Sequence, residues 1–481
     1  MPKRFLPRVP ESRREPAGRA GDFAEVALGY TPEEARREAL RCLSCRRAPC
    51  VTACPLGTRA DLYVPLIARG EVDEAAAVLR HTDPFPAICA RVCHRPCEDV
   101  CLAGKVDFPV AIRALKRYLT EASAAPGAAP APAPAVVPGR VAVVGSGPAG
   151  LAAARVLAQF GHSVVVFDGL DEPGGLLRWG IPAYRLPRHV VAGAVREVSA
   201  LGVEFRHGQR LGRDFELKDL RDAGFQALLL AIGAHRSVRL GIPGEDLPWV
   251  VPGLTYLRDA AAGRSPQVAG PAVVVGGGDA ALDAARSARR LGADPVTIVY
   301  RRSRAEMPAR HEEVLEAEEE GIAFRFLAAP VSMREEAGGG RVRLQEMRLE
   351  ETPGGGRPRP VPVAGSEWDL PATLVVAAVG QIPDPDALPE ALRRALRRGT
   401  IAVDPDTLAT DLPGVYACGD AAGGRANVTD AAAMGQRAAR AMHDYLSAPR
   451  VSPLLDAHGA GRPDRRGPPV TGPSTGSQAA P

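Results

Sequence analysis

Two short apolar runs along the chain are each followed by a glycine-rich turn and then by a helix-like pattern. The first is "RVAVVGSGPAG" at residues 140–150, and the second is "PAVVVGGGDAALDAARSARRLG" at residues 271–292. Strand, glycine turn and helix in this order indicate a parallel α/β sheet. The runs "LLLAIGA" at 228–234 and "LVVAAVGQ" at 374–381 predict further buried strands that end in glycine turns.

A helical pattern precedes the first of these units. The stretch "TPEEARREALRC" carries a helix start signal, with Thr31 as the cap, Pro32 at the first helical position and Glu34 completing a capping box. The helix that it predicts ends at Cys42, where the cysteines of the chain begin.

Composition marks the segments that lie outside the predicted domains. Residues 122–139, "ASAAPGAAPAPAPAVVPG", have the composition of an extended Ala/Pro linker. Residues 1–30 are expected to be a mobile N-terminus, and the Gly- and Pro-rich residues 448–481 a disordered tail. A helical domain is therefore predicted at 31–121, before the α/β part of the chain.

The charge balance excludes some classes of partner. The net charge of +4 arises from 60 basic and 56 acidic side chains, which calls for neither nucleic acid nor an anionic membrane. No apolar run reaches the roughly 18 residues of a membrane span, and the basic start lacks the apolar core of a signal peptide. We therefore expect a cytoplasmic protein, in which cysteine thiols stay reduced.

Eight of the nine cysteines gather in two runs before the linker. They are Cys42, Cys45, Cys50, Cys54, Cys89, Cys93, Cys97 and Cys101. Eight thiolates are the number needed by two four-iron four-sulfur clusters, and a proline after the first run recurs in ferredoxins. Structural zinc sites usually use pairs of close cysteines, and only Cys42 and Cys45 form a tight pair. Spacing alone favours iron–sulfur clusters but leaves zinc and disulfides open.

The first glycine turn carries a complete dinucleotide-binding fingerprint. Gly145 suits the tight turn, Gly147 lets the backbone approach a pyrophosphate, and Gly150 allows close helix–strand packing. The next strand ends at an acidic residue that can bind a ribose hydroxyl. The predicted cofactor-binding residues of this unit are Gly145, Ser146, Gly147, Pro148, Ala149, Gly150 and Asp168.

Two later segments are expected to complete the same site. Gly174 and Gly175 stand in "DEPGGLLRWGIP", where the backbone has to pass closely. Gly419 and Asp420 follow a predicted strand, and an acid there can bind a chain of sugar-like hydroxyls. The helix that begins near Thr429 can direct its N-terminus at phosphate.

The second fingerprint differs at the end of its second strand. Two arginines stand where an acid would recognise a bare ribose, and guanidinium groups suit a 2′-phosphate, so NADPH is favoured over NADH. The alternative is that these arginines begin a solvated basic loop. The predicted residues are Gly276, Gly277, Gly278, Asp279, Ala281, Arg301 and Arg302. Two such units on one chain usually bind one flavin and one nicotinamide, here FAD and NADPH.

Together these motifs resemble the small (beta) subunit of NADPH-dependent glutamate synthase. The same family includes the N-terminal part of dihydropyrimidine dehydrogenase and the large subunit of NADH-dependent ferredoxin:NADP oxidoreductase. The resemblance runs from about residue 31 to 447 and rests on "CLSCRRAPCVTACP", "GSGPAGLAAA", "DEPGGLLRWGIPAYRLP", "VYRRSRAEMP" and "CGD".

The resemblance implies an α/β fold in which a helical iron–sulfur N-terminal domain is followed by two Rossmann-like domains. The FAD-binding domain would comprise residues 140–240 and 370–447. The NADPH-binding domain, residues 241–369, would be inserted in it.

The resemblance also implies how the cysteines are shared between two clusters. One cluster would be held by Cys42, Cys45, Cys50 and Cys101, and three corners of the other by Cys54, Cys93 and Cys97. The family often takes the last ligand from a Gln or Glu in the following helix, where this sequence has Lys116. An ammonium group has no lone pair to donate. Cys89 is the substitute, although relatives can carry a cysteine there without using it.

The implied function is an NADPH-dependent FAD/iron–sulfur oxidoreductase subunit that passes electrons to a large catalytic subunit or a ferredoxin-like acceptor. No side chain is expected to be catalytic, because the chemistry belongs to the cofactors. The alternatives are an electron-transfer subunit of a dihydropyrimidine dehydrogenase or ferredoxin:NADP oxidoreductase complex, and a zinc-binding nucleotide-binding scaffold. Cys418 is the one cysteine beyond residue 101, so it has no second cysteine with which to form a redox pair. We therefore expect Cys418 to be a small buried side chain.

Overall fold

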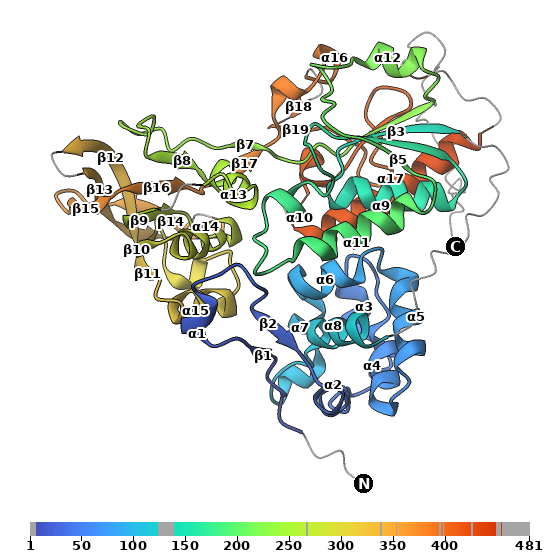
Figure 1. The fold of residues 1–481 in the computed structure, drawn as a ribbon, viewed down its shortest axis with the longest axis horizontal. Coiled ribbons are helices and arrows are strands. Elements are labelled where there is room, and N and C mark those ends of the chain that lie inside the picture. The colour runs from blue at the N-terminus through green and yellow to red at the C-terminus, as the bar shows by residue number, and fades with distance from the viewer. Residues whose placement is uncertain are drawn as a thin grey trace, which may run out of the picture.

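A computed structural model describes most of the chain between the N-terminal arm and the end of the last helix. The described residues are 6–123, 139–265, 268–336, 339–352, 354–393, 396–397, 399–424, 427–448 and 454. The predicted linker at 122–139 and the predicted tail at 448–481 lie almost entirely outside them. The described part forms a helical domain and two α/β domains (Figure 1).

The helical domain confirms the expected helix start. The Thr31 side chain accepts a hydrogen bond from the Glu34 backbone, and the Glu34 side chain accepts one from the Thr31 backbone. The helices are α2 (Pro32–Ala39), α3 (Pro49–Ala53), α4 (Ala60–Arg69), α5 (Val72–Thr82), α6 (Pro86–Val92), α7 (Pro96–Asp99), η1 (Leu102–Lys105) and α8 (Ile112–Ala122). Tyr63, Ile67 and Leu115 are buried at the centre of this domain.

Residues 6–30, which we call the N-terminal arm, are packed against the protein rather than mobile. They form β1 (Ser12–Arg13), α1 (Pro16–Arg19) and β2 (Ala27–Gly29). Arg19 is only 2% exposed, and its Nε donates to Glu320 Oε1 at 3.1 Å. The arm crosses from the helical domain to α15 (His311–Glu319) (Figure 1). The sequence expectation fails here because the acidic partner of Arg19 lies about 300 residues away along the chain.

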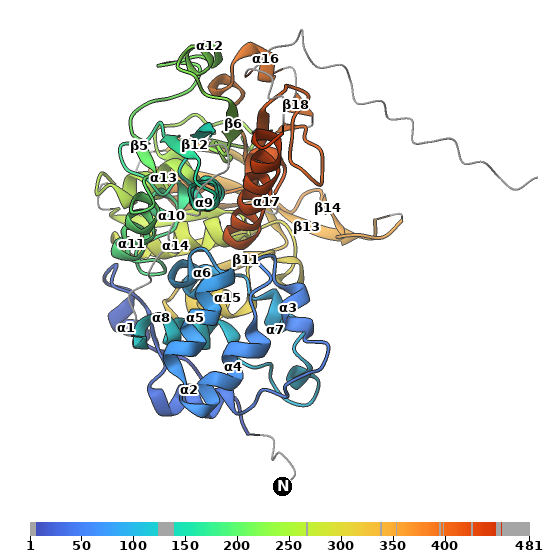
Figure 2. The same cartoon turned by 90° about the vertical axis from the view of Figure 1, so that its right-hand side faces the viewer.

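The first α/β domain is built on a five-stranded parallel sheet with the order β20-β6-β3-β4-β5. Its strands are β3 (Arg140–Val144), β4 (Ser163–Phe167), β5 (Glu204–Arg206), β6 (Ala227–Leu230) and β20 (Val415–Ala417). One face is covered by α9 (Pro148–Gln159), α11 (Arg188–Ser199) and α17 (Val428–Leu446) (Figures 1 and 2). The other face packs against α12 (Leu217–Asp222) and α16 (Glu390–Arg393).

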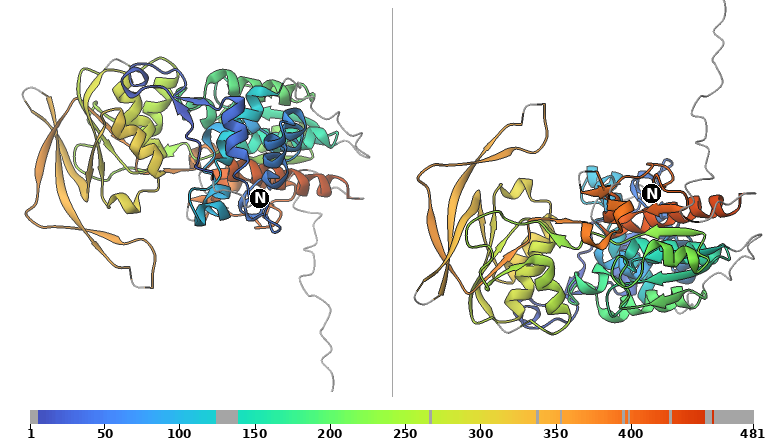
Figure 3. Two further views of the ribbon diagram at one scale, coloured as in Figure 1. Left: turned by 90° about the horizontal axis from the view of Figure 1, so that it is seen from below. Right: turned by 90° about the horizontal axis from the view of Figure 1, so that it is seen from above.

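The second α/β domain has a parallel sheet with the order β11-β10-β9-β16-β8. Its strands are β8 (Val250–Pro252), β9 (Gly270–Val275), β10 (Ala293–Tyr300), β11 (Ala323–Phe326) and β16 (Leu374–Ala377). The helices α13 (Gly253–Ala261), α14 (Asp279–Arg290) and α15 pack on one face. An antiparallel sheet of β12 (Ala328–Glu336), β13 (Gly339–Glu350), β14 (Arg359–Pro362) and β15 (Trp368–Ala372) packs on the other and extends outward (Figure 3).

The second domain is inserted in the first, but the predicted boundary at residue 370 falls too early. β16 lies in the middle of the second sheet, between β9 and β8. The chain leaves the first domain at β7 (Arg236–Ser237) and returns at β17 (Gln381–Ile382), and these two short strands pair with each other. The sequence could not assign β16 because a buried parallel strand has the same apolar pattern in either sheet. Among the described helices, none is long and apolar enough to cross a membrane.

Candidate functional site

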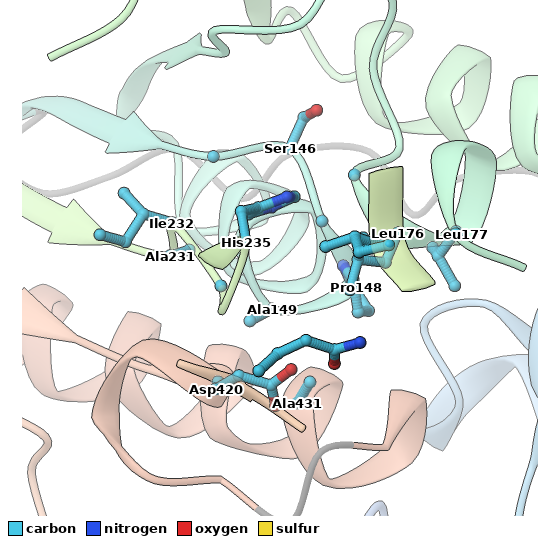
Figure 4. Close-up of a pocket in the computed structure, with 18 of the residues that line it drawn as sticks. Ser146, Pro148, Ala149, Leu176, Leu177, Ala231, Ile232, His235, Asp420 and Ala431 are labelled. Carbon is cyan, nitrogen blue, oxygen red and sulfur yellow. The ribbon is translucent and has the colours of Figure 1, made fainter. Parts of the chain in front are cut away.

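A cavity of about 440 Å³ opens at the carboxyl ends of the strands of the first sheet. Figure 4 shows Ser146, Pro148 and His235 on one side of it and Asp420 and Ala431 on the other. Most residues of the first predicted site line this cavity. They are Gly145, Ser146, Gly147, Pro148, Ala149, Asp168, Gly175, Gly419 and Asp420.

The backbone of the first turn places its three glycines in different surroundings. Gly145 has a φ of 105°, and a Cβ there would overlap the Ala231 carbonyl oxygen. A Cβ on Gly150 would overlap the Gly145 carbonyl oxygen, so this glycine lets α9 pack against the turn rather than line the cavity. A Cβ on Gly147 would meet no heavy atom within 4 Å. The turn therefore leaves open space at Gly147, as a bound pyrophosphate requires.

Asp168 fixes the shape of this turn. Its Oδ2 accepts hydrogen bonds from the Ser146 backbone N at 2.7 Å and from the Ser146 hydroxyl, and its Oδ1 accepts from Leu170 N at 2.8 Å. Ser146 Oγ in turn accepts from Gly174 N at 3.0 Å. Gly174 thus supports the turn from behind, whereas a Cβ on Gly175 would lie 2.8 Å from the Gly147 Cα. The close backbone passage predicted for this glycine pair is present.

The opposite wall comes from the C-terminal part of the chain. Gly419 and Asp420 begin the short helix η4 (Gly419–Ala422). Cys418 is fully buried beside them, and burial raises the pKa of its thiol to about 12. Thr429 does not line the cavity. It is 2% exposed, and its hydroxyl lies 3.1 Å from Asn427 Oδ1 and 4.0 Å from the Cys93 sulfur.

Two histidines of the cavity were not anticipated from the sequence. His235 Nδ1 accepts a hydrogen bond from Arg258 Nη2 at 3.1 Å, and burial together with the Arg258 charge lowers the His235 pKa to about 4. The neutral ring can then present its Nε2 proton to a ligand in the cavity. His94 Nε2 lies 2.8 Å from Asp279 Oδ2, and both residues line the cavity. The sequence did hold a signal for each histidine. His235 directly follows the strand and glycine turn at 228–234, and His94 directly follows Cys93.

The second fingerprint also forms a strand–turn–helix unit, between β9 and α14. A Cβ on Gly276 would overlap the Ala378 carbonyl oxygen, and one on Gly277 would lie 2.5 Å from the Tyr300 ring. Gly278 caps α14, and Ala281 is buried beneath the turn. Asp279, the first residue of α14, also lies in the wall of the first cavity, so the second fingerprint borders that cavity.

The structure gives the two predicted arginines different surroundings. Arg301 is exposed directly after β10. Arg302 Nε donates to the Pro358 carbonyl oxygen at 2.8 Å, which ties it to the antiparallel sheet. Arg301 is therefore the better placed of the two to reach a phosphate.

The first cysteine set comes together as the resemblance implied. Cys42, Cys45, Cys50 and Cys101 line one small cavity of about 30 Å³ beneath α4. Burial and the neighbouring Cys42 and Cys101 raise the pKa of the Cys50 thiol to about 11. Buried thiols this close together lose their protons readily only when a positive centre, such as iron, lies between them. The donor set thus fits an iron–sulfur cluster. Within the described ranges, no group of three or more His, Cys, Asp or Glu side chains is arranged to hold a single metal ion.

The second set surrounds the end of α3 and the start of α7. Thr58 Oγ1 donates to the Cys54 sulfur at 3.2 Å, and the Arg95 backbone N donates to the Cys93 sulfur at 3.3 Å. Burial raises the pKa of the Cys97 thiol, and the adjacent Cys93 and Cys54 raise it further. Cys54 and Cys93 are therefore both close enough to Cys97 to act on its charge.

The Lys116 ammonium group is paired with the Asp83 carboxylate and is not a cluster ligand. Its Nζ donates to Asp83 Oδ2 at 2.8 Å, and both side chains are buried. Cys89 lies beside this pair: burial and the Asp83 charge raise the pKa of its thiol. Next to Lys116, the Tyr63 hydroxyl is buried without a hydrogen-bond partner among the described residues. A donor left without an acceptor beside cysteines fits a site for a group with its own acceptor atoms. Whether Cys89 is the fourth ligand stays a prediction.

Comparison with known proteins agrees with this geometry. Residues 139–435 match the family described as pyridine nucleotide-disulphide oxidoreductase, and residues 19–128 match the 4Fe-4S domain II of dihydropyrimidine dehydrogenase. The chain is 35% identical over 468 residues to the glutamate synthase [NADPH] small chain of Azospirillum brasilense, covering 94% of this chain and 97% of that protein. The chain belongs to this pyridine nucleotide oxidoreductase family. The resemblance inferred from its motifs is confirmed.

Other members of the family are longer. The chain is 41% identical over 435 residues to the NADP(+)-dependent formate dehydrogenase subunit beta of Moorella thermoacetica, covering 85% of this chain and 61% of that protein. It is 37% identical to the NADPH-Fe(3+) oxidoreductase subunit beta of Geobacter sulfurreducens, covering 83% of this chain and 64% of that one. The chain thus spans less than two thirds of the length of these two relatives.

Solved structures share the fold of the α/β part. Mycobacterium tuberculosis FprA in complex with NADPH matches with a TM-score of 0.54 and 21% identity, over 64% of this chain and 85% of that one. The cofactors of the oxidoreductase family are FAD and NADPH, and the N-terminal domain is a four-iron four-sulfur domain. The open turn at Gly147 and the crowded thiols around Cys50 fit these groups.

Proposed function

We propose that this chain is the NADPH-oxidising subunit of a glutamate synthase, which delivers electrons through FAD and two four-iron four-sulfur clusters to a large catalytic subunit. The observation that carries the proposal is the position of Cys93 beside the cavity of about 440 Å³ in the first α/β domain, which we call the flavin-side cavity. The Cys93 sulfur lies 4.0 Å from Thr429 Oγ1, at the start of α17. Val92 and His94, the neighbours of Cys93, both line the cavity.

The residues of the cavity would hold FAD by its phosphates and sugar hydroxyls. Gly147 and the start of α9 would face the pyrophosphate, while Asp168 and Asp420 offer carboxylates on opposite walls. When bound, FAD supplies the acceptance of a hydride and the release of single electrons. His235 would contribute a hydrogen-bond donor, because Arg258 occupies its other ring nitrogen.

The second α/β domain would bring NADPH to this cavity. Asp279 begins α14 of the second fingerprint and also lines the cavity wall, held by His94. A nucleotide on the second fingerprint would therefore have its phosphates near α14 and its nicotinamide end directed to the flavin side. Arg301, exposed at the end of β10, would meet the 2′-phosphate that distinguishes NADPH from NADH.

Two short helices connect the cysteine sets. α3 contributes Cys50 to the first set, and Cys54 at its end belongs to the second. Cys97 of the second set lies in α7, and Cys101 of the first set follows that helix. A separation of four residues is about one helical turn, roughly 5.4 Å. The two clusters would therefore be neighbours, with the second one nearer the flavin-side cavity and the first one nearer the surface.

The identity of the partner rests on the family. A glutamate synthase small chain matches this chain over almost its whole length, which supports a glutamate synthase large chain as the partner. The higher identity to a formate dehydrogenase subunit beta favours a second candidate, electron exchange with a formate-oxidising subunit. The predicted cluster ligands must be reduced thiols, and the cytoplasm keeps thiols reduced. We therefore propose a cytoplasmic location.

The experiment that tests the proposal is purification without oxygen, followed by measurement of iron, sulfide, zinc and FAD. We expect about eight irons per FAD, the content of two clusters, and absorbance bleached by NADPH at lower concentrations than by NADH. Cys93→Ser should lose about four irons and retain FAD, and its matched control Cys418→Ser should retain both. Zinc without iron would refute the proposal.

The partner is tested by adding candidate subunits. A glutamate synthase large chain should produce glutamate from glutamine and 2-oxoglutarate with consumption of NADPH. If only a formate-oxidising subunit supports turnover, the second candidate is correct.

A further inference from the structure

Exposed apolar side chains gather around the first cysteine set. Seven of the twelve exposed large apolar side chains among the described residues belong to the N-terminal arm or the helical domain, and we group six of these, all except Leu28, with the first cysteine set. They are Leu6, Leu40, Leu62, Val100, Val106 and Phe108, which we call the cluster-edge patch. Val106 and Phe108 are each 60% exposed. Apolar side chains collected at one site on a protein surface commonly mark a site of protein contact.

Arg41 holds one part of the patch next to Cys42. Its Nε donates to the Leu6 carbonyl oxygen at 2.9 Å, and its Nη2 donates to the Phe108 carbonyl oxygen at 2.6 Å. Arg41 itself is buried, and Leu40 and Cys42 are its chain neighbours. The loop that carries Val106 and Phe108 is therefore anchored beside a predicted cluster ligand rather than left loose.

The remaining members flank the thiol-lined cavity. Val100 precedes Cys101, and Leu62 follows Asp61, and both Cys101 and Asp61 line that cavity. Figure 2 shows α6, which carries Cys89, next to the α/β domains and α2, which leads to Cys42, at the opposite end of the helical domain. The patch thus lies where the predicted electron path reaches the surface.

The charges beside the patch are mainly positive. Arg46, Arg47 and Lys105 are exposed, and the structure gives them no ion pair within its described ranges. The nearby acids are already paired, because Asp61 binds Arg59 at 2.8 Å and Asp107 binds Arg41 at 3.3 Å. An apolar centre with a cationic rim favours a partner of opposite charge.

We propose that the cluster-edge patch is the docking surface for an acidic electron-accepting protein. The proposal rests on the proposed function, since it assigns the exit of the same electron path. Oxidation of one NADPH to NADP⁺ releases one proton and two electrons, and the docked acceptor is reduced in two one-electron steps. Arg46, Arg47 and Lys105 speed the encounter, and the apolar side chains exclude water where the two redox centres approach.

Two soluble haem proteins of opposite charge test this assignment. The soluble fragment of cytochrome b5 is acidic and cytochrome c is basic, and each accepts one electron. We expect the anaerobically purified chain to reduce cytochrome b5 with NADPH at least tenfold faster than cytochrome c at low ionic strength. Added salt should remove that difference, because it screens exposed charges.

Charge reversal and apolar removal probe the two parts of the surface. Arg46→Glu combined with Arg47→Glu should lower kcat/KM for cytochrome b5 at least tenfold and abolish its salt dependence. Val106→Ser combined with Phe108→Ser should raise its KM several-fold at any salt concentration. Reduction of the small dye ferricyanide and the iron content should stay unchanged in both variants. The matched control, Lys218→Glu with Arg221→Glu on the exposed helix α12, should behave as the unaltered chain.

Equal rates with the two cytochromes at low salt, or patch variants that reduce cytochrome b5 at the unaltered rate, would overturn the docking surface. An equal loss of dye reduction in the patch variants would also overturn it, because the defect would then lie inside the protein. A failure of the proposed function is distinguishable, since the unaltered chain would then lack iron or fail to reduce the dye with NADPH.

Discussion

Replacing Lys116 by methionine tests whether the buried pair with Asp83 organises the second cysteine set. Lys116 Nζ donates to Asp83 Oδ2 at 2.8 Å, and the side chains are 6% and 0% exposed. Without the ammonium group, the Asp83 carboxylate would keep the hydrogen bond from Phe85 N to its Oδ1 at 3.0 Å but would lose its charged partner. Removing one partner of a buried pair costs about 3–5 kcal/mol, since the other charge is left in an apolar environment.

Hydrogen exchange of the α8 backbone amides measures this cost locally. A loss of that size should speed the exchange of protected α8 amides by about 10²- to 10⁴-fold, because about 1.4 kcal/mol corresponds to a factor of ten. The double variant Asp83→Asn/Lys116→Met leaves no unpaired charge and should recover most of the protection. Lys105→Met removes an exposed lysine of the same domain and serves as the control. Unchanged α8 exchange in Lys116→Met would refute the reasoning.

Three further predictions concern the nucleotide sites and the arm. Gly147→Val should fold but purify with less than a tenth of the FAD, because the valine side chain enters the open space at the turn. Gly150→Ala should instead lower the melting temperature, because the added Cβ overlaps the Gly145 carbonyl oxygen. Arg301→Ala should raise the KM for NADPH about 10- to 100-fold, the value of a charge-assisted hydrogen bond, and leave NADH unchanged, with Arg302→Ala showing a smaller rise. Burial opposes ionisation of Glu320, but hydrogen bonds from two arginines hold its pKa at about 2, below the ordinary 4.5. Its stabilisation is therefore complete above about pH 4.5 and is lost as the pH falls towards 2. Acid unfolding followed by circular dichroism should be steeper for the unaltered chain than for Glu320→Gln.

The sequence predicted those parts of the site that depend on local backbone geometry. The tight turn at Gly145 and the close helix packing at Gly150 follow from spacing within one turn, and the structure has both, with open space at Gly147. The gathering of Cys42 with Cys101 was accessible only through the family resemblance, since nothing in their spacing brings residues so far apart together.

The parts that were missed depend on contacts between domains. The arm was expected to be mobile, and its burial follows from an acidic helix that is remote in the sequence. The contact of Asp279 with His94 was missed for the same reason: one belongs to the nucleotide fingerprint and the other to the cysteine runs. The antiparallel sheet did leave a signal, the alternation of Val342 and Leu344 with polar residues along β13.

One charged junction holds the three domains together. The ring of Tyr184, from the first α/β domain, lies under the guanidinium groups of Arg286 and Arg290 at 4.8 and 3.9 Å from their carbon atoms. Both arginines bind Glu320 of the second α/β domain, which also accepts from Arg19 of the arm.

Buried charges of this kind are costly when separated, so relative movement of the three domains would expose or unpair several of them. The contact of His94 with Asp279 joins the helical domain to the second α/β domain on the cavity side. The cysteine domain is therefore more than a carrier of clusters: together with its arm it fixes where the second fingerprint stands relative to the flavin-side cavity. An electron path with short steps requires this fixed geometry.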